Sequence, residues 1–368
     1  MSDFRLPSNA IPVDGRFGCG PSKIRPEQLD YLMAHAQLLG TSHRQKPVRD
    51  LVGRVRDGLA ELYRLPEGYE VILGNGGSTA FWGAAAFSLI ATNSAHLSFG
   101  EFGNKFVTAA RAPWLSAPVV VEGDPGTVSE FSGAEEADVF AYPHNETSTG
   151  TMAPVRRIDK PGALTVVDAT SAAGGVDIDI RETDVYYFAP QKNFASDGGL
   201  WFALVSPAAI KRIESIAQSG RYIPEILSLS IALDNSRLNQ TLNTPAIATL
   251  ILLDAQIQWM NTNGGLAWAD ARTRTSSSLI YDWAEAHAHA TPFVTDKRHR
   301  SQVVATIDFD ETVDAPGVSA LLRANGIVDI DPYRSFGRNQ LRIGTFTSVE
   351  SDDVAALLRA IDAAISAL

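Results

Sequence analysis

Short apolar runs alternate with helical segments through the first 205 residues of the chain. The runs with strand character are residues 70–73, 95–99, 118–121, 139–142, 163–167, 184–189 and 200–205. Helical spacing of apolar residues follows several of them, at 79–90 and from residue 102 onwards. This alternation predicts a mostly parallel sheet that is covered by helices on both faces. In such sheets, ligands bind at the carboxyl ends of the strands.

The length of the chain and a change of pattern predict a second, smaller domain. The 368 residues exceed the roughly 250–300 residues at which one hydrophobic core stops growing. After residue 244 the sequence indicates helices at 246–260 and 266–287, strands near 303–309 and 341–343, and a final helix at 352–368. We expect a large α/β domain over residues 1–255, with an irregular N-terminal arm, and a smaller C-terminal α/β domain over residues 256–368.

Charge and cysteine content exclude several classes of protein. The 31 basic and 42 acidic residues give a formal net charge of −11, which disfavours nucleic acid and acidic membrane surfaces as partners. No stretch approaches the ~20 apolar residues of a membrane span, and the first residues lack a signal-peptide pattern. Cys19 is the only cysteine, so neither an internal disulfide nor a cysteine-based zinc site is expected. We therefore expect a cytoplasmic protein without a metal site.

A glycine-rich turn, Gly74-Asn-Gly-Gly-Ser-Thr79, follows one predicted strand and opens a helix. Free backbone N–H groups at a helix start bind phosphate well, and glycine lets the backbone approach closely. An ordinary strand-to-helix turn is the alternative. A dinucleotide fingerprint would require a third glycine where Thr79 stands, and the lysine of a P-loop is absent.

Asp168 ends the apolar strand at 163–167 and precedes small residues. Such a carboxylate either caps a helix or turn, the commoner case for a lone aspartate, or is a buried charge that needs a cationic partner. A protonated pyridine nitrogen is one such partner.

Lys192 is the third candidate, and it differs from the other six lysines of the chain. It alone follows a fully apolar strand and lies among small and polar residues. An amine that loses hydration is more readily neutral and nucleophilic, whereas a surface-loop lysine is the alternative.

Taken together, the three strand ends match one kind of ligand. An aldehyde cofactor with a phosphate tail and a ring nitrogen needs an amine, an anion cradle and a carboxylate. Phe102, which follows a further strand, is either an aromatic that stacks on such a ring or a core residue.

At this point the sequence resembles the class V, fold-type I pyridoxal-phosphate enzymes, and within them the phosphoserine aminotransferases. The similarity runs over nearly the whole chain. It is carried by Gly20-Pro-Ser22, Ser42-His-Arg44, Gly76-Gly-Ser78, Asn145-Glu-Thr147, Asp168, Gln191-Lys192, Asn243-Thr244 and an arginine-rich segment at 334–342. The resemblance implies a homodimer with active sites shared between its subunits.

The resemblance also implies how pyridoxal 5′-phosphate is held. Lys192 would bind the cofactor through its amine, and Asp168 would pair with the ring nitrogen. Thr147 would bond the ring hydroxyl. Phe102 would stack on the ring at the position where many relatives have tryptophan.

The cofactor's phosphate would be held by residues of both subunits. The resemblance assigns it to Gly77, Ser78 and Gln191 of one subunit and to Asn243 and Thr244 of the other.

For the substrate, the resemblance implies a set of cationic residues suited to small anionic amino acids and keto acids. His43 and Arg44 would meet its anionic groups, and Arg342 would bind it near the C-terminus. Either Arg334 or Arg338 would be the companion arginine. Arginine suits bidentate capture of carboxylate and phosphate.

The implied reaction is reversible transamination between O-phospho-L-serine and 2-oxoglutarate, which gives 3-phosphohydroxypyruvate and L-glutamate. Lys192 would move a proton between the substrate Cα and the cofactor. The pathway implied is L-serine biosynthesis, with pyridoxine biosynthesis as a further role.

Three alternatives remain open from the sequence. Another class V aminotransferase or a lyase such as a cysteine desulfurase is one, although a desulfurase would need Cys19 as its nucleophile. An NAD-dependent oxidoreductase built on residues 74–79, with Glu101 as the ribose carboxylate, is the second. A non-catalytic pyridoxal-phosphate binder is the third.

Overall fold

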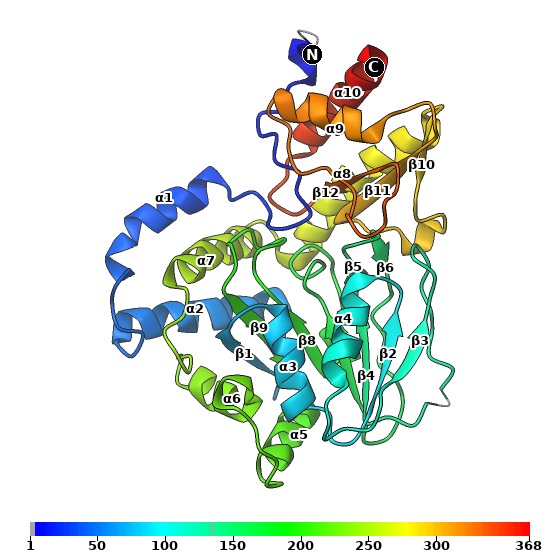
Figure 1. The fold of residues 1–368 in the computed structure, drawn as a ribbon. Coiled ribbons are helices and arrows are strands. Elements are labelled where there is room, and N and C mark those ends of the chain that lie inside the picture. The colour runs from blue at the N-terminus through cyan, green and yellow to red at the C-terminus, as the bar shows by residue number, and fades with distance from the viewer. Residues whose placement is uncertain (1–3, 134) are drawn as a thin grey trace.

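The computed structural model describes residues 4–133 and 135–368 and has at its centre a seven-stranded sheet (Figure 1). The strands lie in the order β1-β9-β8-β7-β4-β2-β3. Their bounds are β1 (Glu70–Asn75), β2 (Ser94–Ser98), β3 (Val119–Glu122), β4 (Val139–Pro143), β7 (Leu164–Asp168), β8 (Val185–Phe188) and β9 (Leu200–Val205). All seven strands expected from the sequence are confirmed, to within a few residues at their ends.

The sheet is mostly parallel, as predicted, and β9 is the exception. β9 pairs antiparallel with β1 on one side and with β8 on the other, whereas β8, β7, β4, β2 and β3 pair in parallel. Only residues 189–199 connect β8 to β9, and a parallel crossover needs a dozen or more residues. The chain therefore reverses there, and this reversing loop contains Lys192.

Helices cover both faces of the sheet, as predicted from the alternation (Figure 1). Side chains of β8 point alternately to the two faces, with Tyr186 and Phe188 on one and Tyr187 on the other. The first face packs against α2 (Lys46–Leu62) and α7 (Ile247–Thr262). The second packs against α3 (Ser78–Ser88), α4 (Glu101–Ala110), α5 (Pro207–Ala217) and α6 (Leu229–Arg237).

A second hydrophobic core surrounds a small antiparallel sheet. Its strands are β10 (Ala290–Pro292), β11 (Val304–Phe309) and β12 (Gln340–Gly344), and its helices are α8 (Gly265–Ala286), α9 (Ala315–Ala324) and α10 (Ser351–Ala367). Leu6, Ala10 and Phe17 of the N-terminal arm pack into the same core, so the two ends of the chain lie side by side (Figure 1). The division at residues 255/256 stays a prediction.

The shorter elements complete the fold. They are η1 (Ser8–Ala10), α1 (Pro26–Ala34), η2 (Ala36–Leu38), β5 (Asn145–Glu146), β6 (Thr151–Met152), η3 (Ile180–Glu182), η4 (Glu225–Leu227) and η5 (Lys297–His299). Within residues 4–133 and 135–368, every helix is too short or too polar to span a membrane.

Candidate active site

A cavity of about 320 Å³ opens at the carboxyl ends of the central strands. Its volume lies at the lower end of the range of about 300–1,000 Å³ that is usual for small-molecule sites. The segments that line it are the N-terminal arm, the starts of α3 and α4, the β5 region, and the ends of β7 and β8 with the loops that follow. Its residues are Gly20, Pro21, Gly77, Ser78, Thr79, Trp82, Phe102, Asn145, Thr147, Asp168, Thr170, Gln191 and Lys192.

Lys192 lies in this cavity with a buried amine, which is the first of the two alternatives that the sequence left open. The side chain is almost fully covered, and burial lowers its pKa from 10.5 to about 8. Nζ donates a hydrogen bond to the backbone oxygen of Cys19 at 2.6 Å. Gly20 leaves the room for this contact, because a Cβ there would lie 2.4 Å from Cε of Lys192. The arm therefore packs against the amine and contributes to its burial.

Asp168 combines the two alternatives that the sequence left open. Its Oδ1 accepts hydrogen bonds from the backbone N–H and the hydroxyl of Thr170, at 2.9 and 2.6 Å, as in a capped turn. Its Oδ2 accepts from the Tyr187 hydroxyl at 2.9 Å and from Trp82 Nε1 at 3.2 Å. The carboxylate is buried, and every donor that the described residues offer it is uncharged. A protonated ring nitrogen would supply the cationic partner that a buried charge needs.

The expected phosphate cradle forms the next part of the cavity wall. Gly77 is the N-cap of α3 and offers no capping side chain, so the first amides of the helix keep their donors for a ligand. A Cβ on Gly77 would meet nothing within 4 Å, which leaves the backbone open to close approach. Gln191 lines the same cavity, and the NH₂ group of its side-chain amide is a donor suited to a phosphate oxygen. These features fit a phosphate group.

Phe102 and Thr147 lie in the same cavity. The ring centroid of Phe102 is 6.0 Å from Lys192 Nζ, and its ring is half-buried against the helices on this face. Phe102 is thus a wall of the cavity as well as an edge of the core. The Thr147 hydroxyl donates to Ser171 Oγ at 2.8 Å. An amine, a carboxylate, an aromatic wall and an anion cradle therefore meet at one place and fit pyridoxal phosphate.

Arg342 lies beside this group, on β12. Its Nη1 donates to the backbone oxygen of Thr147 at 2.9 Å, and its guanidinium is 5.1 Å from the ring centroid of Tyr333. Its positive charge also lowers the pKa of Lys192, after the larger effect of burial.

The other expected residues are not lining residues of the cavity. Arg338 is exposed and pairs with Asp308, with Nε 3.2 Å from the carboxylate. Arg334 is also exposed and lies in the loop before β12.

The remaining four, His43, Arg44, Asn243 and Thr244, form a separate group. His43 Nδ1 is 3.2 Å from Thr244 Oγ1, and Arg44 donates to the backbone oxygen of Leu242 at 3.2 Å.

Sequence reasoning missed Trp82, Tyr187 and Thr170, which hold Asp168. Their own elements can be predicted from the sequence, but the contacts of Trp82 and Tyr187 with Asp168 are visible only in the folded chain. Trp82 follows Ser78 by four residues and so shares its helix face, and Tyr187 is the Cα partner of Asp168 in the neighbouring parallel strand.

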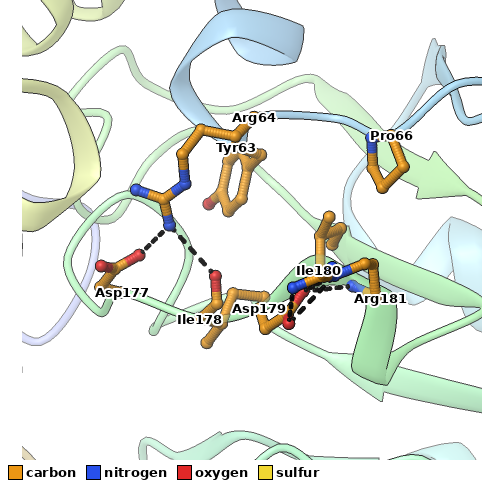
Figure 2. Close-up of a pocket in the computed structure, with 8 residues that line it drawn as sticks. All are labelled: Tyr63, Arg64, Pro66, Asp177, Ile178, Asp179, Ile180 and Arg181. Carbon is orange, nitrogen blue, oxygen red and sulfur yellow. Dashed lines mark hydrogen bonds and ion pairs between the residues drawn. The ribbon is translucent and has the colours of Figure 1, made fainter.

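A larger hollow of about 670 Å³ lies elsewhere and contains none of the expected residues (Figure 2). Its charged residues neutralise one another: Arg64 pairs with Asp177 and Arg181 with Asp179. It has no buried nucleophile or free charge, so the smaller cavity remains the candidate active site.

Comparisons with known proteins agree with this geometry. The family model described as aminotransferase class V matches residues 124–329. A phosphoserine aminotransferase of Rhodococcus opacus is 56% identical over 366 residues, which cover 99% of this chain and 98% of the relative.

Two solved structures share the fold. A phosphoserine aminotransferase from Cytophaga hutchinsonii has a TM-score of 0.87 at 23% identity and covers 97% of this chain and 99% of its own. A pyridoxal-phosphate-bound phosphoserine aminotransferase from Trichomonas vaginalis has a TM-score of 0.80 at 18% identity, with 94% and 99% covered. With a buried lysine amine and a strand-end carboxylate in one cavity, the chain belongs to the class V aminotransferases, in the phosphoserine aminotransferase family, and its cofactor is pyridoxal phosphate.

Proposed function

We propose that the enzyme transfers an amino group reversibly between the pair O-phospho-L-serine and 3-phosphohydroxypyruvate and the pair L-glutamate and 2-oxoglutarate. It would act in the cytoplasm in L-serine biosynthesis, with a contribution to pyridoxine biosynthesis. The observation that carries this proposal is the free edge of Arg342 beside Lys192.

Arg342 has hydrogen-bonding capacity that the chain does not use. Its Nη1 is engaged by Thr147, but Nε is buried without a partner in the described residues. The Nε and Nη2 edge of a guanidinium matches a carboxylate in bidentate geometry. All four proposed substrates carry an α-carboxylate, so this edge would orient each of them with Cα towards Lys192.

A second cation is needed for the phosphate of phosphoserine and the distal carboxylate of glutamate. Arg338 is already paired with Asp308, whereas no ion pair joins Arg334 to another described residue. We therefore assign Arg334 as the companion of Arg342. Tyr333 precedes it and packs against Phe102, with ring centroids 6.1 Å apart, which places this loop near the cavity.

The remaining phosphate and substrate ligands would come from a partner subunit in a homodimer. His43, Arg44, Asn243 and Thr244 are grouped on one surface of the chain. Large apolar side chains are also exposed on α1, just after η2, before and within η4, and after α6, which favours association with a second copy. They are Leu29, Met33, Leu39, Tyr222, Ile226 and Leu238.

The residues divide the chemistry between them. Pyridoxal phosphate supplies, when bound, a ring that withdraws electrons from the substrate Cα. Lys192, whose amine is more readily neutral than that of an exposed lysine, would take the proton from Cα and return it to the cofactor's C4′. Asp168 would keep the ring nitrogen protonated. Thr147 would orient the cofactor ring by bonding the hydroxyl group of that ring.

An amino-donor screen with 2-oxoglutarate tests the substrate. Glutamate formation from phosphoserine should exceed that from alanine or serine by at least tenfold in kcat/KM, and Lys192→Ala should abolish it. A preference for alanine or serine would overturn the substrate and leave the cofactor assignment standing.

The alternatives have little support in the geometry. Cys19 is buried among apolar side chains and burial raises its thiol pKa, so it is a poor desulfurase nucleophile. Glu101, the ribose carboxylate of the NAD alternative, pairs with Lys105 at 3.2 Å. The family membership speaks against a non-catalytic binder.

A further inference from the structure

Glu146 carries a carboxylate that is completely buried next to the active site. It stands between Asn145 and Thr147, which both line the cavity. Buried carboxylates are normally paired with a cation, because an isolated charge is costly away from water. Every hydrogen-bond donor to Glu146 within residues 4–133 and 135–368 is nevertheless uncharged, so the carboxylate needs another explanation.

The donors to Glu146 are backbone N–H groups of α4 and both the N–H and the hydroxyl of Ser148 in its own turn. Oε2 accepts from the N–H groups of Phe102 and Gly103, each at 3.0 Å. Oε1 accepts from the N–H and hydroxyl of Ser148, at 3.2 and 2.6 Å. Ser148 Oγ in turn accepts the N–H of Glu101 at 3.1 Å. The amides of residues 101, 102 and 103 are therefore all satisfied from the β5 turn.

These three amides belong to the first turn of α4, where a helix has no internal acceptors. The N-cap position is Gly100, which has no side chain to accept them. A Cβ on Gly100 would lie 2.3 Å from Cγ of Glu146, so glycine is what allows the carboxylate to reach the helix start. A negative charge is also favoured there by the helix dipole.

We propose that Glu146 is a positioning residue that caps α4 from a distant part of the chain and thereby fixes the ring of Phe102 against the cofactor. The inference rests on the proposed role of Phe102 as the wall that stacks on the cofactor ring. The cap joins the backbone of Phe102 to the turn that carries Thr147. The cap therefore holds two residues at a fixed separation. Phe102 is expected to stack on the face of the cofactor ring, and Thr147 is expected to bond the hydroxyl group of that ring.

The test is Glu146→Gln in the holoenzyme. The NH₂ group of glutamine would take the place of one carboxylate oxygen and face the two donors that this oxygen accepts from. Two of the four hydrogen bonds are then replaced by donor–donor contacts. We expect the dissociation constant of pyridoxal phosphate to rise at least tenfold, and the circular dichroism of the bound cofactor to weaken.

The matched control is Glu135→Gln. Glu135 also carries a carboxylate that accepts backbone N–H groups, those of Ser132 and Gly133 at 2.9 Å, but it lies nearer the surface and does not line the cavity. This variant should change neither cofactor affinity nor the cofactor signal. Should Glu146→Gln fail to fold, Ser148→Ala removes one donor to Glu146 and should give a smaller shift of cofactor affinity in the same direction.

A double-mutant cycle with Phe102→Ala separates positioning from general stability. If Glu146 acts through Phe102, the double variant should bind the cofactor about as weakly as Phe102→Ala alone. Fully additive losses, or unchanged cofactor affinity in Glu146→Gln, would overturn the proposal. If Phe102→Ala alone left cofactor affinity unchanged, the proposed stacking role of Phe102 would fail instead, whatever the effect of Glu146→Gln.

Discussion

The buried amine of Lys192 should make the stability of the cofactor-free protein depend on pH. Burial lowers the pKa of this amine from 10.5 to about 8. At about 1.4 kcal/mol per pH unit, the difference corresponds to about 3 kcal/mol against the charged amine in the folded chain. Lys192→Met keeps most of the volume and removes the charge. It should therefore raise the free energy of unfolding of the cofactor-free protein by up to about 3 kcal/mol at pH 7.

The sign of the pH dependence follows from the order of the two pKa values. Since the folded-state pKa lies below the unfolded-state pKa, the folded chain loses its proton first as pH rises. Between about pH 8 and 10.5 the unfolded chain binds more protons, so the Lys192 contribution to stability improves with pH. The penalty is fully present below pH 8 and disappears above 10.5. The advantage of Lys192→Met should shrink accordingly, from about 3 kcal/mol at pH 7 to near zero at pH 10.5.

Urea unfolding at pH 7, 8, 9 and 10 measures this difference, with tryptophan fluorescence as the signal. Because both proteins share all other titrating groups, subtraction isolates Lys192. Lys46→Met is the matched control, since the Lys46 side chain is 81% exposed and should give no pH-dependent difference from wild type. A stability difference between wild type and Lys192→Met that is constant across pH, or a variant that is less stable at pH 7, would refute the reasoning.

Three further predictions concern catalysis and cofactor binding. Arg342→Lys should raise KM for the amino acid and the keto acid by about 10- to 100-fold in steady-state kinetics, because lysine cannot form the bidentate pair worth ~1.5–3 kcal/mol. Arg334→Ala should raise KM for phosphoserine about tenfold, whereas Arg338→Ala, which breaks only an exposed pair with Asp308, should change it less than twofold; the reverse order would exchange their roles. Phe102→Trp should lower the dissociation constant of pyridoxal phosphate a few-fold in absorbance titrations, since a larger ring adds ~0.5–1 kcal/mol of stacking.

The sequence predicted the sheet and singled out Lys192, with a buried amine as one of two alternatives, because both depend on local apolar patterning. Each strand is a short apolar run, which is typical of a strand that is buried on both faces of a sheet. Lys192 lies in the loop that follows one of these runs. The helices α1, α5, α6 and α9 were not identified. α6 has apolar residues on only part of one face, and α5 and α9 both have a proline in their first turn, which is also typical of the loop that follows a strand.

The contacts around Asp168 and Glu146 could not be predicted, because they join residues that are far apart in sequence. Trp82 is 86 positions from Asp168, and Phe102 is 44 positions from Glu146. Apolar periodicity places each residue on a face of its own element but does not state which element lies opposite. The resemblance named Asp168 and Thr147 as ligands. The burial of the Glu146 carboxylate, in contrast, is explained only by the position of α4, whose first amides donate to it.

His43 and Thr244 lie next to each other and are not among the residues that line this chain's own cavity. The two side chains contact each other at 3.2 Å, although one was expected to bind substrate and the other the cofactor's phosphate. Arg44 reaches the same turn through the backbone oxygen of Leu242. One surface therefore carries residues that were expected to bind both anions, and none of them lines this chain's own cavity. If that surface completes the cavity of a second copy, phosphate anchoring and substrate capture are acquired in one association step, which couples cofactor retention to assembly.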